Sequence, residues 1–255
     1  LALRKRIRGS GTRSALNSVT SLPSPPRTYF SVQRLLASKG FHLSRLVELL
    51  KQEVALSSLM LKAANSVYYG SRTPIDSLDK AVSLLGLNTV VSLVLGAEIF
   101  SKIDARTSKR FGVEQLFEHS ARVAATAANL AERIPETRHL KDLAYTGGLL
   151  HDIGKLVCIH TMGGAYEVIV KRSAAERPDL WRDELEMMGA SHQEIGAYVL
   201  TLWGIPDPIV EAAAFHHQPI LQPSPEVSVL TFVTAANLLD HGLPSADAID
   251  GTPEV

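Results

Sequence analysis

The most informative stretch of this sequence reads Gly148-Leu149-Leu150-His151-Asp152-Ile153-Gly154-Lys155. The residues that lead into it place one apolar face at helical spacing: Leu140, Leu143, Ala144, Gly147 and Leu150. His151 continues this face, so we expect its imidazole to point toward packed side chains rather than water. We expect Gly154 to close the helix and Lys155 to supply a cation. Because a buried charge needs a partner or a cation, the adjacent Asp152 indicates a polar site within a helical core.

Helical periodicity extends along the chain on both sides of this stretch. Apolar residues recur at helical spacing, for example at Leu78, Val82 and Leu85. Proline and glycine separate the periodic segments: Pro74, Gly86, Gly112, Pro135, Pro178 and Pro206. No alternation of apolar and polar residues is long enough to build a sheet, so the pattern predicts an all-α fold of about a dozen helices. We expect a polar seam at residues 101–112 and a core that contains Leu84, Leu85, Leu149, Leu150 and Val199.

The composition limits the function classes. The 255 residues are 45% hydrophobic and 20% charged, which is enough apolar content for a sizeable core. Basic and acidic residues number 26 each, so the overall charge does not point to nucleic acid, which is not an expected partner. The single cysteine, Cys158, excludes an internal disulfide and a thiolate zinc cage. No apolar run suits a membrane span or a secretory signal, so we expect no membrane association and a cytoplasmic location.

The charges are unevenly distributed along the chain. Residues 1–47 carry nine basic groups and no acidic one, and residues 1–26 show no sustained amphipathic period. We interpret 1–26 as a basic linker or tail and 246–255 as a C-terminal tail. Because the chain begins at Leu1 rather than methionine, we expect it to be a piece of a longer protein.

Histidines on other predicted helices could join His151 and Asp152. His119 follows the inward stripe of its helix, and His192 falls in a first turn because Ser191–Glu194 has capping-box spacing. Asp207 is predicted to be the N-cap of a helix with proline at its first position, and this helix ends near two more histidines. Nitrogen and oxygen donors of this kind suit zinc, manganese or iron. The candidate metal ligands are His119, His151, Asp152, His192, His216 and His217.

A different interpretation stays open for each of these rings. A single inward histidine is most often a core residue that donates to a backbone carbonyl. The remaining histidines lack a comparable sequence context and are expected at the surface: His42, His139, His160 and His241.

These motifs resemble a known family. The stretch Leu149-Leu150-His151-Asp152-Ile153-Gly154-Lys155, with Glu118-His119-Ser120 upstream, resembles the HD superfamily of metal-dependent phosphohydrolases. Three N-terminal segments resemble its HDOD branch (HD-related output domain): Ser21-Leu22-Pro23-Ser24-Pro25-Pro26, Leu59-Met60-Leu61-Lys62-Ala63-Ala64-Asn65-Ser66 and Lys80-Ala81-Val82-Ser83-Leu84-Leu85-Gly86-Leu87. Two C-terminal segments do so as well: Trp203-Gly204-Ile205-Pro206 and His216-His217-Gln218-Pro219. The resemblance covers residues 20–240 in the family's order.

The resemblance implies an N-terminal helical bundle over residues 27–108, packed on a five-helix HD-like domain over residues 109–245. It also implies a bacterial signal-transduction module, often joined to an N-terminal receiver or sensory domain and usually regarded as non-enzymatic. Its partners would be signalling proteins. We expect a partner surface near Tyr68, Tyr69 and the stripe of residues 90–95, although most residues of that stripe are expected to pack against the HD-like half.

The catalytic relatives of this branch, the HD-GYP phosphodiesterases, have metal ligands at positions that match the six candidates above. Their final aspartate falls on Asn237 here, with Asp240 one helical turn later, so both are weaker candidate ligands. The lysine after the His-Asp pair matches Lys155, the one candidate catalytic residue, which would neutralise charge on a phosphate. Gln115 replaces a ligating glutamate of some members, and no Gly-Tyr-Pro segment follows His217. We therefore predict a non-catalytic output module that acts through protein–protein interaction. The alternative is a metal-dependent phosphohydrolase or cyclic-dinucleotide phosphodiesterase.

Overall fold

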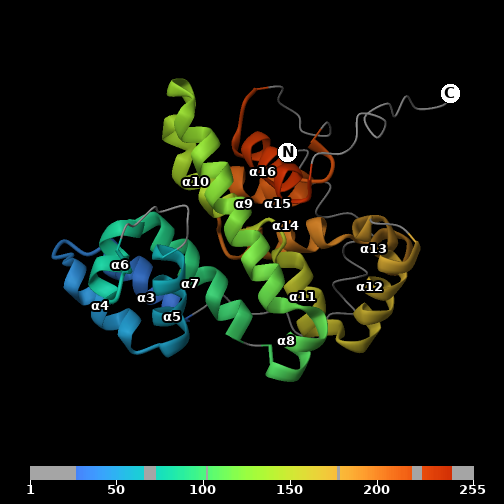
Figure 1. Ribbon diagram of the computed structural model, residues 1–255, viewed down its shortest axis with the longest axis horizontal. Helices are drawn as coiled ribbons and strands as arrows, with labels where there is room; N and C mark the ends of the chain where they lie inside the picture. The colour runs from blue at the N-terminus through green and yellow to red at the C-terminus, as the bar shows by residue number, and fades with distance from the viewer. Residues whose placement is uncertain (1–26, 66–72, 102, 177–178, 220–225, 243–255) are drawn as a thin grey trace.

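A computed structural model describes residues 27–65, 73–101, 103–176, 179–219 and 226–242 (Figure 1). Within these ranges the chain is helical and contains no strand, which confirms the predicted all-α class. The helices are α3 (Arg27–Leu36), α4 (Leu43–Lys51), α5 (Val54–Ala64), α6 (Leu78–Leu85), α7 (Leu87–Ser101), α8 (Ala105–Phe111), α9 (Val113–Arg133), the 3-10 helix η2 (Pro135–Leu140), α10 (Lys141–Leu150), α11 (Ile153–Met162), α12 (Gly164–Glu176), α13 (Leu180–Met188), α14 (His192–Leu202), α15 (Asp207–Phe215) and α16 (Val229–Asp240).

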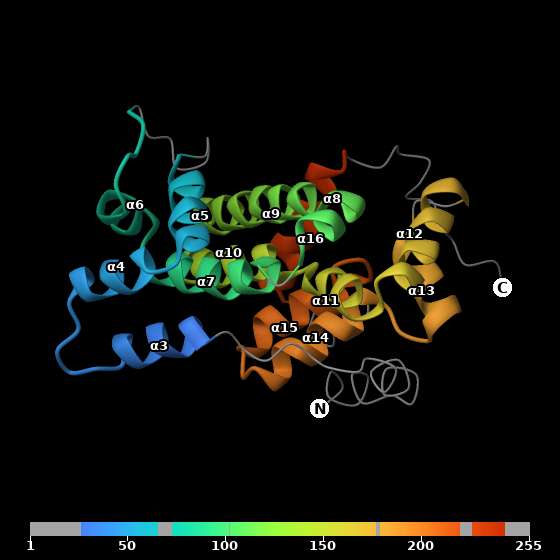
Figure 2. The ribbon, with the colours of Figure 1, turned by 90° about the horizontal axis from the view of Figure 1, so that it is seen from below.

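Helices α3–α7 form a bundle on one side of the long helix α9, and α11–α14 lie on its other side (Figures 1 and 2). The core of this bundle is continuous with side chains from α9 and α10, including Ala124 and Leu149. Four of the five predicted core residues are buried. Leu84 is the exception, because it lies on the outer face of α6 and is 39% exposed, whereas its neighbour Leu85 is 6% exposed.

The polar stretch predicted as a seam forms a short surface helix. The side chain of Asp104 caps α8 by accepting hydrogen bonds from two backbone amides, and α8 contains no buried residue. The predicted domain boundary at residue 108 lies inside this helix, and the limits of the two halves remain a prediction.

The part of the predicted partner surface that the structure describes is mostly buried. Val90, Leu93 and Val94 are fully buried and belong to the core of the N-terminal bundle, while Tyr68 and Tyr69 lie outside the described residues. Among the described helices, none alone has both the length and the apolar character of a membrane span. Leu78–Leu85 and Leu87–Ala97 meet those criteria only as a pair, and they are bent by 111°.

Two glycines allow the close helix contacts that assemble the C-terminal half. A Cβ on Gly148 would lie 2.6 Å from the Cα of Ala124, so α10 and α9 can meet only without a side chain there. A Cβ on Gly154 would lie 1.8 Å from the carbonyl oxygen of His192, at the crossing of α11 and α14. The prediction that Gly154 closes a helix was therefore wrong, because Gly154 lies in the first turn of α11. The predicted cap at Asp207 was also wrong, because the N-cap of α15 is Pro206.

Candidate metal centre

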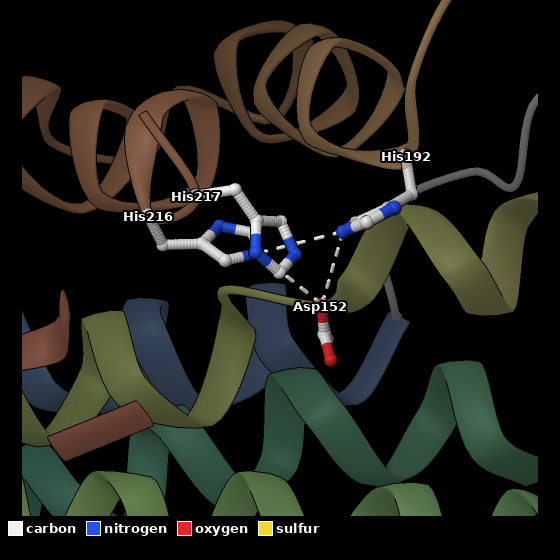
Figure 3. A group of neighbouring side chains, drawn as sticks. All are labelled: Asp152, His192, His216 and His217. Atoms are coloured by element: carbon white, nitrogen blue, oxygen red, sulfur yellow. Dashed lines mark hydrogen bonds and ion pairs between the residues drawn. The ribbon is translucent and has the colours of Figure 1, made fainter. Parts of the chain in front are cut away.

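The structure brings the six main candidate ligands together from separate helices. His119 lies on α9, and His151 and Asp152 form the link between α10 and α11. His192 is the first residue of α14, which begins with the predicted capping box between Ser191 and Glu194. His216 and His217 directly follow α15 and face His192 and Asp152 (Figure 3).

The Asp152 carboxylate lies between two groups of imidazoles. Its Oδ1 is 3.3 Å from Nε2 of His192 and 3.4 Å from Nε2 of His216. These two histidines form, with His217, what we call the His192 cluster, whose ligand atoms all lie within 4.8 Å of one another. On the other side, Asp152 Oδ2 is 3.4 Å from Nε2 of His151 and 3.8 Å from Nε2 of His119, which together form the His119 cluster.

Hydrogen bonds at the outer ring nitrogens fix the orientation of four imidazoles. Nδ1 of His151 donates to the carbonyl oxygen of Gly148 at 2.7 Å, and Nδ1 of His216 donates to that of Ala213 at 3.0 Å. A carbonyl oxygen can only accept, so Nδ1 carries the proton and Nε2 presents a lone pair in the neutral ring. The remaining two rings have carboxylate acceptors.

Those acceptors are Glu184, which is 2.6 Å from Nδ1 of His192, and Asp240, which is 2.7 Å from Nδ1 of His119. Histidines that bind metal in proteins commonly donate their outer N–H to a carboxylate or a carbonyl in this way. The four Nε2 atoms therefore all face the interior of the site.

The donor atoms fit a divalent metal ion. Nε2 of His119 lies 3.3 Å from Nε2 of His151, and Nε2 of His192 lies 3.4 Å from Nε2 of His216. The lone pairs on two Nε2 atoms this close together repel each other unless a cation or a proton lies between them. Asp152 Oδ1 is buried and accepts no hydrogen bond, and the same is true of the amide oxygen of Asn237 on α16. Asp152 and the imidazoles around it could hold a metal ion, and such an ion would satisfy the buried Asp152 oxygen that lacks a donor.

Electrostatics keep the carboxylate charged and most of the rings neutral. Burial lowers the pKa of His151 to about 3, and burial also lowers the pKa of His216 and of His217. For Asp152, burial acts to raise the pKa, but the neighbouring ammonium and imidazoles outweigh it, so its pKa is well below the ordinary value. For His192, burial acts to lower the pKa, but the carboxylates beside it raise it overall. Neutral imidazoles and an ionised carboxylate are the protonation states that bind metal.

Lys155 is the closest charged group to Asp152. Its Nζ donates to Asp152 Oδ2 at 2.6 Å, and its side chain is 20% exposed, so it reaches from the site toward solvent. This agrees with the cation that the sequence places beside the carboxylate.

Two carboxylates have roles that the sequence did not predict. Glu184 on α13 is fully buried and accepts from the backbone amide of His192 and from the Tyr166 hydroxyl, in addition to Nδ1 of His192. Asp240 supports His119 from outside and accepts two hydrogen bonds from Arg122, which hold the pKa of Asp240 at about 2. The only sequence signal for Glu184 is a charged residue on the inward face of α13. The ring of His241 is exposed as predicted but lies 4.8 Å from that of His119.

Several solved structures share this fold. An HDOD domain protein of unknown function from Geobacter sulfurreducens has a TM-score of 0.72 and 23% identity, over 93% of this chain and 78% of that one. A protein of Shewanella amazonensis SB2B, whose name suggests a phosphohydrolase, has a TM-score of 0.69 and 23% identity, over 92% and 81%. A protein of Marinobacter aquaeolei VT8, whose name suggests signal transduction, has a TM-score of 0.63 and 21% identity, over 94% and 54%.

The sequence comparisons identify the family. An uncharacterised protein of Treponema pallidum (strain Nichols) is 27% identical over 230 residues, which make up 88% of this chain and 43% of that protein. This chain therefore spans less than half of that relative. The HDOD domain family matches residues 22–219, which is most of the chain and includes both the N-terminal bundle and the histidine clusters. The chain belongs to the HDOD domain family.

Proposed function

We propose that this chain is a signal-transduction module whose HD-like half binds divalent metal ions and hydrolyses a phosphate ester. The observation that carries the proposal is the position of Asp152, whose two oxygens face two separate groups of inward-pointing imidazoles. A carboxylate shared in this way is typical of paired metal sites in phosphatases and nucleases. The name of the Shewanella protein points in the same direction. Manganese, iron and zinc all suit these nitrogen and oxygen donors.

The residues of the chain have distinct tasks in such a reaction. When bound, divalent ions supply positive charge that attracts the phosphate and makes a water molecule more acidic. Asp152 and the five histidines would hold them, and Glu184 and Asp240 keep two of those rings in the correct orientation. Lys155 would move its ammonium group from Asp152 to a phosphate oxygen and neutralise charge there.

A second candidate is a non-catalytic output module that acts through protein–protein contacts. The observation that favours it is Asn237, which occupies the position of the catalytic relatives' final aspartate and provides one neutral oxygen instead of a carboxylate. Less negative charge weakens the hold on a second cation. In this case the partners would be signalling proteins, and the histidine clusters would have a structural task.

Metal analysis and a hydrolysis assay separate the two candidates. The purified chain should contain bound manganese, iron or zinc, and should cleave bis-(p-nitrophenyl) phosphate, a nucleotide or a cyclic dinucleotide in a reaction that a chelator abolishes. The double variant with His151→Ala and Asp152→Ala should lose both metal and turnover. His160→Ala is the matched control, because His160 is exposed on α11 and belongs to neither cluster. Bound metal without turnover of any of these substrates would favour the interaction module, and absence of both metal and turnover would refute the phosphohydrolase.

A further inference from the structure

We propose that the two clusters bind metal in a fixed order, and that Lys155 enforces this order by occupying the Asp152 oxygen that the His119 cluster needs. The His192 cluster fills first. The His119 cluster fills second, and it binds its ion more tightly when an anion takes the Lys155 ammonium away. The inference rests on the metal binding in the proposed function, but not on hydrolysis.

The two oxygens of Asp152 are in different states. Oδ1, on the side of the His192 cluster, accepts no hydrogen bond although two ring nitrogens lie within 3.4 Å. Oδ2, on the side of the His119 cluster, accepts the Lys155 ammonium at 2.6 Å. A cation can therefore bind Oδ1 without displacing any group, whereas a cation at Oδ2 must displace the charge-assisted hydrogen bond from Lys155.

The surroundings of the two clusters add to this difference. The His192 cluster offers three imidazoles, and the carboxylate behind it, Glu184, is fully buried and receives its hydrogen bonds from His192 and a neutral tyrosine. The His119 cluster offers two imidazoles, and the carboxylate behind it, Asp240, is paired with the guanidinium of Arg122. The His192 cluster thus has more ligands and more uncompensated negative charge, and both favour the first cation there.

An anion can change the state of Lys155. Its side chain is partly exposed, so a phosphate or phosphonate group arriving from solvent can accept from its ammonium group. Asp152 Oδ2 then becomes free for a cation in the His119 cluster. Binding of the second cation and of the anion should therefore be mutually favourable, and each must strengthen the other by the same factor.

Titration of the full chain with Mn²⁺, after removal of metal by a chelator, tests this order. Calorimetry should resolve two classes of Mn²⁺ site, of which only the weaker one becomes tighter when methylphosphonate, a phosphate analogue that is not hydrolysed, is present. Two equivalent sites, or a weaker site that is indifferent to methylphosphonate, would overturn the proposal. This measurement uses the unmodified protein and does not depend on any variant.

Substitution of Lys155 provides the second test. Lys155→Gln removes the competing charge, so the weaker Mn²⁺ site should become about 10- to 100-fold tighter without methylphosphonate and should no longer respond to it. Lys155→Arg keeps the charge and should retain the two classes and the response. Lys171→Gln is the matched control, because Lys171 is exposed and, within the described residues, forms its ion pair with Glu167 rather than with a member of either cluster. A Lys155→Gln variant that is folded by circular dichroism but binds the second Mn²⁺ more weakly would contradict the competition.

The outcomes separate this inference from the proposed function. Ordered binding that responds to methylphosphonate, without hydrolysis of any of the substrates above, would support the inference and favour the interaction module over the phosphohydrolase. Hydrolysis with two equivalent and independent Mn²⁺ sites would do the reverse. A chain that binds no Mn²⁺ would refute the inference, and a chain that binds neither manganese, iron nor zinc would refute both.

Discussion

The metal-free protein should lose stability in mild acid, and His151 should account for much of the loss. Its ring is fully buried, and burial lowers its pKa from 6.5 in the unfolded chain to about 3 in the folded protein. A histidine whose pKa is lowered by folding contributes its full stability above the unfolded value and loses it as the pH falls toward the folded value. Between pH 7 and about pH 5 the unfolded chain takes up a proton that the folded protein does not, and the free energy of unfolding should fall by about 2 kcal/mol.

Neighbouring groups modify this slope in known directions. The pKa values of His216 and His217 are also lowered, so they add to the loss between pH 6.5 and lower values. The pKa of His192 is raised, so its contribution is present below pH 6.5 and disappears as the pH rises through its folded pKa, which opposes the others. The pKa of Asp152 lies well below 3.8, so its contribution is lost only in stronger acid, below that value.

Urea unfolding followed by circular dichroism at pH 7 and at about pH 5, in the presence of a chelator, measures this slope. The unmodified chain should be compared with His151→Gln, which has no titrating ring at that position. The variant should show a pH-dependent loss that is smaller by about 2 kcal/mol, while any packing cost common to both pH values cancels. An equal loss in both proteins would refute the assignment of His151 as a buried neutral imidazole.

Three further perturbations test the packing and the outer shell of the site. Leu150→Ala should lower the free energy of unfolding by about 2–5 kcal/mol in urea melts, because Leu150 is fully buried, and Leu84→Ala should cost much less than this because Leu84 is partly exposed. Gly154→Ala should cost about 3 kcal/mol or fail to fold, because its Cβ would collide with the carbonyl of His192, and a variant of unchanged thermal stability would contradict the close contact of α11 and α14. Glu184→Gln should weaken the tighter Mn²⁺ site by about 10- to 100-fold in calorimetry, and an unchanged affinity would show that the carboxylate does not support the ligand.

The sequence predicts the helical class because the signals for a helix lie within a short stretch of neighbouring residues. Apolar residues at helical spacing, with helix breakers on either side, are enough to predict that α6 forms. The capping box of Ser191 and Glu194 is enough to predict where α14 begins. It is harder to predict which face of a helix is buried, because the side chains of consecutive residues point in directions that are separated by a large rotation about the helix axis. Leu84 and Leu85 have the same side chain, and only the packing of α6 in three dimensions decides which of them is buried.

Glycine shows the same limit in another form. At the end of an apolar run a glycine usually closes a helix, and Gly154 fits that pattern by its position. Its actual task is to let α11 approach α14, and this depends on a contact with His192, 38 positions later in the chain. No local pattern distinguishes a glycine that ends a helix from one that permits a helix crossing.

In the candidate site too, sequence patterns predict some residues and miss others: they predict the inner ligands but not the outer carboxylates that support them. The inner ligands carry sequence signals, because a metal requires several donors at fixed short distances and the helices must present them at particular positions. The outer carboxylates need only reach one ring nitrogen from any direction, so no spacing relates Glu184 to His192 or Asp240 to His119. The sequence predicts Asp240 as a weaker candidate ligand because it lies one helical turn after Asn237, and the structure places it behind His119, in contact with Arg122.

The gathering of several imidazoles around Asp152 leaves repulsion that the folded chain does not relieve equally on the two sides of the carboxylate. In their neutral forms, the four rings present lone pairs to one another and to a buried carboxylate, which is unfavourable unless a cation is present. The hydrogen bonds at their outer nitrogens fix the rings in this orientation, so the repulsion cannot be relieved by rotating them. Lys155 donates a hydrogen bond on one side only, at Asp152 Oδ2. The side without an internal cation is where an external one should gain most free energy, and that gain must appear equally as stabilisation of the folded state.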